Sequence, residues 1–480
     1  MLVGVIRKKT LAEALHLVAG LDASLYDCLE LRLDACADFG AGDRAPALER
    51  LRSCRLPLPA IFTLRRPEEG GDYRGSEEDR LACLASLMRL KPAYMDIEAS
   101  VPPERIAAIR ALSPETVVLL SRHDFEKTPE SLQAVLDSMR ERAGGVIHKI
   151  AVRARSGLDA LRMLAFCREQ SRRKVPLIGI SMGKDGESTR ILAPVAHTGF
   201  CYCPVEEASA PGQLDVLTLR NRYQAHRLNQ DTAVYGLLGD PVEQSAGHVY
   251  HNEQNMLAGI NAVYVKWRIA GEELGEALPL LAAFGVRGLS LTMPLKEAAL
   301  PLADCLEEAA AAIGAVNTLR AEEGGWRGTN TDGQGALESL PPDLAGKKLV
   351  MLGAGGAARA VAREAARRGA ELLVYNRSRN KELPGGVTTR PLSSLEELKD
   401  MPYAVIINAL PFDADFSFAG IPFQPGSLAL DLSYGRKSVF LELAGAAGCR
   451  VLDGAGMFRG QARLQRKFWG LPVDGGGPVP

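Results

Sequence analysis

The stretch Val146-Ile147-His148-Lys149-Ile150-Ala151-Val152 places a lysine inside a short apolar run that is typical of a buried β-strand. It is one of eight such runs, which recur about every 25–30 residues in the first 205 residues. The runs are Leu2–Ile6, Leu25–Leu33, Leu58–Leu64, Ala93–Ile97, Val117–Leu120, Val146–Val152, Leu177–Ser181 and Phe200–Val205. Stretches between them, such as Thr10–Ala19, Glu77–Arg89 and Leu158–Gln170, have apolar residues at helical spacing. This alternation over about 220 residues predicts an α/β fold of the (β/α)8 barrel type.

Ionisable residues gather where several of these strands end, and barrel enzymes place their chemistry at those ends. The set comprises Glu30, Arg32, Asp34, Arg65, Glu69, His123, Asp124, Lys149 and Arg190. Glu30, Arg32 and Asp34 alternate with leucines, so we expect all three on one face of a single strand. The sequence therefore predicts an active site inside the barrel.

Lys149 is the leading candidate for the chemistry of this site. Burial disfavours an ammonium group, and a desolvated lysine can attack a ketone as the free amine and form a Schiff base. Two alternatives remain open from the residues alone: Lys149 at a strand end could extend to solvent, and His123 could be a structural histidine.

The first half resembles type I 3-dehydroquinate dehydratase. The matching segments are Glu30-Leu31-Arg32-Leu33-Asp34, Thr63-Leu64-Arg65 with Glu69, Ser121-Arg122-His123-Asp124-Phe125, Lys149-Ile150-Ala151-Val152, Ser181-Met182-Gly183, Arg190, and Ser209-Ala210-Pro211-Gly212-Gln213. The resemblance implies that Lys149 forms an imine with the substrate, that His123 is the general acid and base, and that Glu69 orients His123. It further implies a set of substrate-binding residues: Glu30, Arg32, Arg65, Met182, Arg190, Ser209 and Gln213. A protonated imine is itself an electron sink, so no metal is needed. Ile180 replaces a second methionine of the family, an apolar change that should cost little.

The pattern changes past Arg220, and we expect a domain boundary near Leu228–Thr232. Domain one would then span residues 1–228 and domain two residues 229–480. In the second domain, Lys347–Leu352 reads as a strand that runs into Gly353-Ala354-Gly355-Gly356-Ala357-Ala358 and a helix. This context suits a dinucleotide-binding turn, in which glycines let the backbone approach the pyrophosphate at a helix N-terminus.

The next strand, Glu371–Tyr375, ends in Asn376-Arg377-Ser378 and not in an acid. An acid there would favour NAD, whereas Arg377 can pair with the 2′-phosphate of NADP. The cofactor expected is therefore NADP. A solvated loop arginine is the alternative for Arg377.

The second half resembles shikimate dehydrogenase. The matching segments are Gly236–Ser245 with His251-Asn252, Leu291–Lys296, Gly314–Thr318, Asn330–Gly333, Asp431–Tyr434, Gly456-Met457 and Gln461-Ala462. The resemblance implies a substrate lobe of about residues 233–335 plus a C-terminal helix of about 456–470, and a Rossmann lobe of about 336–455. Lys296 and Asp332 would be the catalytic pair, with Ser245, Thr292, Asn317, Tyr434 and Gln461 around the substrate. Residues around the cofactor would be Gly353, Ala354, Gly355, Gly356, Ala357, Asn376, Arg377, Ser378 and Gly454.

This half departs from the family pattern at three places. The usual Ser-x-Ser-Pro is Ser245-Ala246-Gly247-His248, the usual Asn-Val-Thr is Ser290-Leu291-Thr292, and the usual Asn-Ala-Thr is Asn408-Ala409-Leu410. Together the two resemblances imply a bifunctional enzyme of the shikimate pathway that makes 3-dehydroshikimate and reduces it to shikimate. The alternatives are a catabolic quinate or shikimate dehydrogenase, favoured by the departures, and a non-catalytic sensor of pathway intermediates.

Composition is typical of a cytoplasmic enzyme with small-molecule substrates. A net charge of −1 argues against a nucleic-acid binder, and no 18-residue apolar run suggests a membrane span. The first predicted strand starts at Leu2 and leaves no room for a leader peptide. Nine cysteines without framework spacing indicate reduced thiols, and neither Cys201-x-Cys203 nor His248-x-x-His251 has the further ligands of a zinc site. We expect the tail Leu471–Pro480 to be disordered.

Overall fold

The computed structural model describes residues 1–40, 42–206, 212–378, 382–410, 415–433 and 437–473. Two of the predicted site residues, Ser209 and Tyr434, lie outside this described part. The predicted tail Leu471–Pro480 also lies outside it from residue 474 onward. The chain forms two compact units, the first of Met1–Val234, Asn261–Ile269 and Gly275–Val286 and the second of Tyr235–Ile260, Ala270–Leu274 and Arg287–Pro480. A domain boundary at Leu228–Thr232 stays a prediction.

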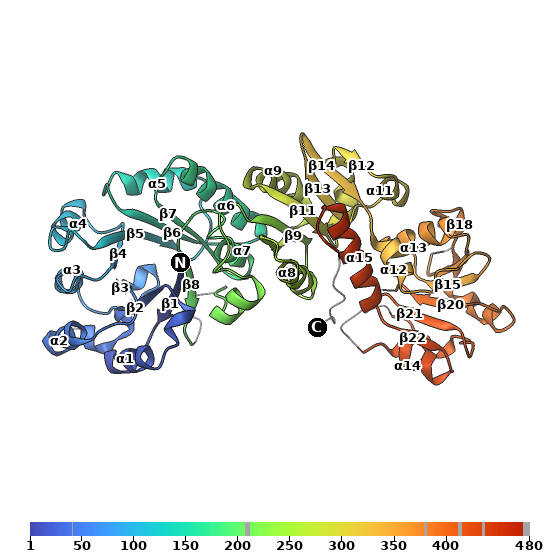
Figure 1. Cartoon of the computed structure of the whole chain (residues 1–480), viewed down its shortest axis with the longest axis horizontal. Coiled ribbons are helices and arrows are strands. Elements are labelled where there is room, and N and C mark those ends of the chain that lie inside the picture. Colours follow the sequence, from blue (N-terminus) through green and yellow to red (C-terminus); the bar gives the residue numbers. More distant parts are fainter. Residues whose placement is uncertain (41, 207–211, 379–381, 411–414, 434–436, 474–480) are drawn as a thin grey trace. The chain divides into compact units, whose positions relative to one another are not determined.

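The first unit contains the predicted (β/α)8 barrel (Figure 1). Its strands are β1 (Leu2–Ile6), β2 (Cys28–Arg32), β3 (Ala60–Thr63), β4 (Tyr94–Glu98), β5 (Val117–Asp124), β6 (Ile147–Arg153), β7 (Leu177–Met182) and β8 (Cys201–Pro204). They run parallel in the order β7-β6-β5-β4-β3-β2-β1-β8, which places the first and last strands side by side, as closure requires. The barrel predicted from the eight apolar runs is confirmed.

Helices follow the strands and cover the outside of the barrel. They are α1 (Leu11–Ala19), α2 (Ala45–Ser53), α3 (Glu77–Met88), α4 (Pro103–Arg110), α5 (Leu132–Arg140), α6 (Gly157–Arg172) and α7 (Glu187–Ile191). Four of them begin at a serine or threonine whose side-chain oxygen accepts a hydrogen bond from a backbone N–H of the first turn; these residues are Thr10, Ser76, Ser131 and Ser156. Such caps satisfy donors that the helix itself cannot.

Inward-facing side chains change character along the strands. On β5 the inward series runs from buried Leu119 to Ser121 and His123, and on β2 it runs from buried Cys28 to Glu30. Cys28 and Leu119 belong to an apolar cluster inside the barrel. On these two strands the polar side chains come after the apolar ones, toward the end where the strands finish.

The second part of the chain begins with a mixed sheet of order β10-β9-β11-β13-β14-β12. Its strands are β9 (Ala233–Gly239), β10 (Ala262–Arg268), β11 (Val286–Leu291), β12 (Cys305–Leu306), β13 (Thr318–Glu322) and β14 (Gly325–Thr329). The helices that accompany it are α8 (Gly247–Leu257), α9 (Leu274–Phe284), α10 (Leu295–Ala298), α11 (Glu308–Ile313) and α12 (Asp332–Glu338). We call this the substrate lobe.

A parallel sheet of order β19-β16-β15-β20-β21-β22 follows. Its strands are β15 (Lys348–Leu352), β16 (Glu371–Asn376), β19 (Arg390–Pro391), β20 (Val405–Asn408), β21 (Leu428–Asp431) and β22 (Arg450–Leu452), and its helices are α13 (Gly356–Arg367) and α14 (Val439–Ala446). The short strands β17 (Glu382–Leu383) and β18 (Val387–Thr388) pair separately. Taken in chain order, this is the 3-2-1-4-5-6 arrangement of dinucleotide-binding sheets, with an apolar core on each face. We call it the cofactor lobe.

The chain leaves the substrate lobe through α12 and comes back through α15 (Ala455–Phe468), and these two helices cross at glycines. A Cβ on Gly335 would lie 2.4 Å from the backbone nitrogen of Gln461, and one on Gly460 would lie 2.7 Å from the carbonyl oxygen of Gly335. The last turn of α15 returns to the substrate lobe, where the Trp469 indole donates to the Leu319 carbonyl at 2.9 Å. Only glycine permits this close crossing.

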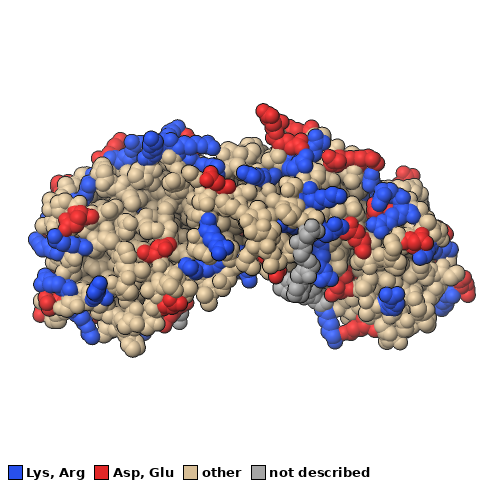
Figure 2. Space-filling view, in the orientation of Figure 1, with Lys and Arg blue, Asp and Glu red and all other residues tan. Residues whose placement is uncertain are grey.

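The surface is mixed in charge. Figure 2 shows Lys and Arg side chains interspersed with Asp and Glu side chains on the face drawn, in keeping with the net charge of −1. Among the described helices, none combines the length and apolarity needed to cross a membrane. The nine cysteines are free thiols.

Candidate active sites

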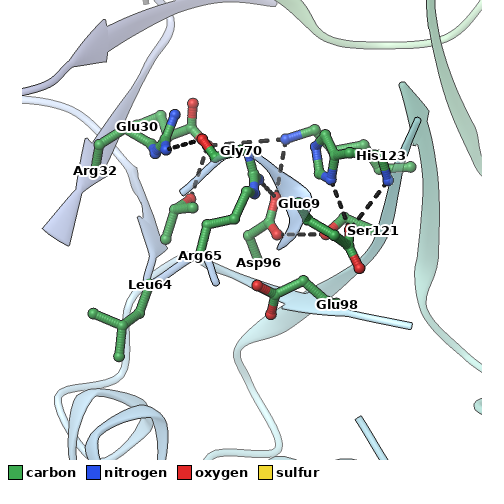
Figure 3. A network of polar contacts seen from close by, with 12 residues as sticks. Glu30, Arg32, Leu64, Arg65, Glu69, Gly70, Asp96, Glu98, Ser121 and His123 are labelled. Carbon is green, nitrogen blue, oxygen red and sulfur yellow. Dashed lines mark hydrogen bonds and ion pairs between the residues drawn. The ribbon is translucent and has the colours of Figure 1, made fainter. Parts of the chain in front are cut away.

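The barrel site is a network of charged side chains enclosed at the C-terminal end of the strands (Figure 3). Glu30 and Arg32 come from β2, Asp96 from β4 and Lys149 from β6, and each is at most 6% exposed. One expectation was wrong in detail: Asp34 lies beyond the end of β2, in a 3-10 turn, and not on the strand with Glu30 and Arg32. It still pairs with Arg32 through two hydrogen bonds of 2.9 and 2.7 Å.

Lys149 points into the barrel and does not extend to solvent. Its Nζ lies 2.9 Å from Asp96 Oδ2, 3.9 Å from Glu30 Oε1 and 4.4 Å from the centre of the Tyr202 ring. The burial expected for Lys149 is present, and a carboxylate is its hydrogen-bond partner. Attack on a ketone uses the free amine.

Asp96 is the central acceptor of this network, and the sequence analysis missed it. Its Oδ2 accepts hydrogen bonds from Lys149 and, at 2.8 Å, from Arg65, while Oδ1 accepts from Ser121 at 2.6 Å. Burial alone would raise the pKa of Asp96, but the adjacent Arg65 and Lys149 outweigh it and hold this pKa well below the usual range. The available signal was an acid inside the apolar run Ala93–Ile97, the same pattern that drew attention to Lys149.

His123 and Glu69 form a hydrogen-bonded dyad beside Lys149. His123 Nδ1 lies 3.0 Å from Glu69 Oε2, which also accepts the backbone N–H of His123 at 3.1 Å. Burial, and then the positive charges of Arg65 and Lys149, place the pKa of His123 well below 6.5. Burial, and then the negative charge of Glu98, raise the pKa of Glu69 to about 7. The imidazole is therefore neutral, with Glu69 facing one nitrogen and leaving the other for a substrate.

The strand register brings His123 and Lys149 to the same place. Ser121 pairs with Lys149 across β5 and β6, and His123 follows Ser121 by two residues, so all three face the interior. The loop that carries Arg65 and Glu69 is held by Glu98, which accepts from the Arg66 backbone at 2.9 Å. Glu98 is itself paired with Arg80 at 2.6 Å, deep in the wall.

The remaining predicted barrel residues surround this network to different degrees. Arg190 on α7 is buried and donates to the Ser181 carbonyl at 3.0 Å, and burial lowers its pKa to about 10. Met182 and the departing residue Ile180 are both buried in the apolar cluster of the barrel. Gln213 is partly buried.

The second site centres on Lys296 and Asp332, which the fold brings into contact. Lys296 Nζ on α10 lies 2.5 Å from Asp332 Oδ2 at the start of α12. The Asn317 side-chain amide donates to Asp332 Oδ1 at 2.7 Å and to Thr331 Oγ1 at 3.0 Å. Asp332 is 1% exposed, whereas the Lys296 side chain is 25% exposed. The cation thus reaches the surface of the site while its partner is fixed beneath it.

The departures from the family pattern have structural consequences around this pair. Gly247 begins α8 and donates its N–H to Ser245 Oγ at 3.2 Å, so the remaining hydroxyl of that motif is held at the start of this helix. Ser290 is buried and donates to Gln465 at 3.0 Å. Leu410 is 9% exposed in a core of the cofactor lobe. Thr292 lies at the end of β11, and the backbone of Gln461 accepts from Thr331 at 3.4 Å.

The cofactor lobe has the cradle that a dinucleotide needs. Gly353 has a φ of 99°, and a Cβ there would lie 2.8 Å from the Ala409 carbonyl oxygen. Apart from chain neighbours and the backbone of α13 itself, no described atom lies within 4 Å of where a Cβ would stand on Gly355 or Gly356, so a phosphate can approach the backbone. Strand β16 ends at Asn376, beside this turn. The next two residues, Arg377 and Ser378, are exposed. Ala354, Ala357 and Gly454 complete the predicted set, Gly454 at the cap of α15. These residues fit NADP.

Two family models match the chain: type I 3-dehydroquinase over residues 4–230 and shikimate dehydrogenase substrate binding domain over residues 237–319. The chain is 32% identical over 483 residues to the chloroplastic bifunctional 3-dehydroquinate dehydratase/shikimate dehydrogenase of Arabidopsis thaliana, covering 93% of this chain and 78% of that protein. It is 32% identical over 401 residues to the shikimate biosynthesis protein AroDE of Chlamydia muridarum, covering 80% of each. It is 37% identical over 253 residues to the shikimate dehydrogenase (NADP(+)) of Xanthomonas campestris pv. campestris, covering 49% of this chain and 89% of that protein.

Proposed function

The chain belongs to the family of bifunctional 3-dehydroquinate dehydratase/shikimate dehydrogenases, and we propose which of its residues carry the two reactions. It is an enzyme of the shikimate pathway that dehydrates 3-dehydroquinate to 3-dehydroshikimate and reduces 3-dehydroshikimate to shikimate with NADPH. We assign dehydration to Lys149 and His123, and reduction to Lys296 and Asp332. The observation that carries the assignment is one lysine–aspartate contact in each site, at 2.9 and 2.5 Å.

In the barrel, Lys149 attacks the ketone carbon as the free amine, and water leaves as the imine forms. Asp96 then lies beside the nitrogen that carries the positive charge, so its carboxylate stabilises the protonated imine. Arg65 and Ser121 keep this carboxylate in place throughout. Arg190, Ser209 and Gln213, with Glu30, Arg32 and Met182, hold the substrate in this proposal.

His123 moves the protons of the elimination. Its free ring nitrogen takes the proton on the carbon next to the imine, and the electron pair of that C–H bond enters the imine system. Glu69 faces the other nitrogen and stabilises the imidazolium that results. The same proton passes to the departing hydroxyl, which leaves as water, and a water molecule then hydrolyses the imine to release the product and Lys149.

In the second site, Lys296 is the proton donor and Asp332 positions it. NADPH supplies the hydride. Negative charge develops on the ketone oxygen, and the Lys296 ammonium stabilises it and then protonates it. Asp332 is fixed by the Asn317 amide and in turn fixes the position of Lys296. Arg377 pairs with the 2′-phosphate of the cofactor in this assignment, and Ser245, Thr292 and Asn317 face the substrate.

The test is product identification with purified protein. With 3-dehydroquinate alone we expect 3-dehydroshikimate, and on addition of NADPH we expect shikimate with one NADPH consumed per molecule formed. Quinate in place of shikimate would favour the catabolic alternative, and tight binding of the intermediates without turnover would favour a sensor.

We also propose that the protein acts in the cytoplasm on small molecules, without a nucleic-acid or membrane partner. The mixed surface charge and the nine free thiols support this placement. Fractionation of the native host followed by activity assay checks it, and recovery of both activities with a membrane pellet would contradict it.

A further inference from the structure

Helix α13 links the cofactor turn to the segments that carry the catalytic pair of the second site. Its N-terminus, at Gly355 and Gly356, is where the pyrophosphate of the cofactor approaches. One turn further along, α13 touches the immediate neighbours of both Lys296 and Asp332. The helix that binds the cofactor is therefore also a wall of the catalytic site.

The first contact is an ion pair between Arg359 on α13 and Glu297 on α10. Glu297 follows Lys296 directly, so the pair ties the helix of the catalytic lysine to the helix of the cofactor turn. The side chain of Arg359 is 22% exposed, and its buried Nε has no partner among the described residues. Lys296 is held from its other side as well, because its carbonyl accepts the Val316 N–H at 2.7 Å.

The second contact is made by backbone alone. A Cβ on Gly333 would lie 2.1 Å from the carbonyl oxygen of Ala360, so the start of α12, where Asp332 sits, rests directly on α13. Ala360 also packs against Ile313 and Ala315, in the segment that leads to Asn317. A displacement of α13 by a fraction of an ångström would reach Asp332 without any flexible side chain to absorb it.

We propose that α13 couples cofactor binding to the geometry of Lys296 and Asp332, with Arg359 and Glu297 as positioning residues. The proposal rests on the NADP site and catalytic pair assigned above. When the cofactor fixes the N-terminus of α13, the ion pair and the Gly333 contact fix the two catalytic segments with it. Substrate should then bind more tightly to the enzyme that already holds cofactor, and the reverse must hold to the same degree.

A second ion pair on the same helix supplies a matched control. Arg363 lies one turn beyond Arg359 and pairs with Glu308 on α11 at 2.8 Å. It also joins α13 to the substrate lobe, but neither Glu308 nor its neighbours carry the catalytic pair. Breaking it removes a comparable surface charge pair without touching the proposed link.

The experiment measures the dissociation constant of shikimate by calorimetry, with and without saturating NADPH, in the full-length protein, because shikimate and NADPH are both reduced and cannot react. The ratio of the two constants is the coupling factor. Because Glu297 is 68% exposed, its ion pair is worth little in isolation, and we expect Arg359→Ala and Glu297→Gln each to lower the coupling factor roughly two- to fivefold. The double variant should lose no more than either single variant, since both remove the same link. Arg363→Ala and Glu308→Gln should keep the wild-type factor.

Three outcomes would overturn the proposal. A wild-type coupling factor of one would show that the sites do not communicate. A loss with Arg359→Ala but none with Glu297→Gln would make Arg359 a direct phosphate contact, and equal losses in the Arg363 and Glu308 controls would make the effect a general loosening of α13. Failure of the wild-type enzyme to oxidise shikimate with NADP⁺ would instead refute the assigned function, and the shikimate affinity of each variant without cofactor reports that its reductase half is folded.

Discussion

The two active sites use the same pair of side chains, a lysine on an aspartate, in opposite surroundings. Asp96 in the barrel accepts from Lys149 and from a second cation, Arg65, on the same oxygen. Asp332 in the reductase site accepts from Lys296 and from the neutral amide of Asn317. The Lys149 side chain is 4% exposed and the Lys296 side chain 25%.

The difference matches the different tasks of the two lysines. A nucleophile must lose its proton, and Asp96 still has Arg65 beside it when Lys149 becomes an uncharged amine. A proton donor must keep its charge until the hydride arrives, and no second cation contacts Asp332 in the described part of the chain. The second cation is therefore the clearest difference between the surroundings of the two carboxylates.

Removal of Lys149 is the largest test of this contrast. Lys149→Ala should lower the dehydratase kcat by about 10⁴-fold or more, since the covalent route is lost, and should leave the reductase unchanged. In the wild type, borohydride with 3-dehydroquinate should add the mass of the reduced adduct to the peptide containing Lys149, and EDTA should have no effect. Labelling at another lysine would remove the contrast, because Lys149 would then not be the nucleophile.

Removal of Lys296 tests the other half. Lys296→Ala should slow NADPH oxidation with 3-dehydroshikimate by roughly 10²- to 10⁴-fold, the usual contribution of a positioned proton donor. The dehydratase activity of the same sample is the control and should stay near the wild-type value. If the dehydratase activity falls together with the reductase activity, the two sites depend on each other and cannot be compared as independent active sites.

A substitution of Arg377 tests cofactor recognition in the reductase. Arg377→Ala would remove the proposed charge-assisted hydrogen bond to the 2′-phosphate, so NADPH binding should weaken about 10- to 150-fold while NADH binding changes little. Arg390→Ala is a matched control in the same lobe, because Arg390 is ion-paired with Glu397 at 2.9 Å. Fluorescence titration measures both constants, and equal losses for the two cofactors would show that Arg377 does not read the phosphate.

Glu69 gives the smallest expected effect and a pH signature. Its pKa is raised to about 7, so it is protonated below that pH and faces His123 as a carboxylate only above it. The dehydratase kcat should therefore fall as pH drops through about 7. Glu69→Gln should lower the maximal dehydratase kcat roughly tenfold, as loss of an orienting partner does. It should also abolish the fall of kcat at low pH. If kcat still falls through pH 7 in Glu69→Gln, the group that titrates is not Glu69.

Local pattern was enough for the barrel and for the group of ionisable residues at the ends of its strands. The predicted run Leu2–Ile6 coincides with β1, and the helix expected over Glu77–Arg89 covers Glu77–Met88. The pair Lys296 and Asp332 came only from a family resemblance, because 36 residues and several elements separate them. The resemblance implied the roles of these two residues but not how they contact each other.

The sequence could not predict which distant residues the fold brings into contact. Lys149 contacts Asp96, which lies 53 residues earlier, and Asp96 in turn contacts Arg65 from the loop after β3. Its own neighbours, Met95 and Ile97, are ordinary core residues, so the local signal shows a buried acid but not its partners. The contact of Ser290 with Gln465 spans 175 residues and likewise has no local signal.

The glycine crossing of α12 and α15 also determines how this protein can be rearranged. Because the chain departs along α12 and returns along α15 past the same point, at Gly335 and Gly460, the whole cofactor lobe is an insertion with adjacent ends. Segments with adjacent ends can be exchanged as cassettes without rerouting the host chain. A cofactor lobe from another dehydrogenase could be grafted between these two glycines, and the crossing itself would have to be kept.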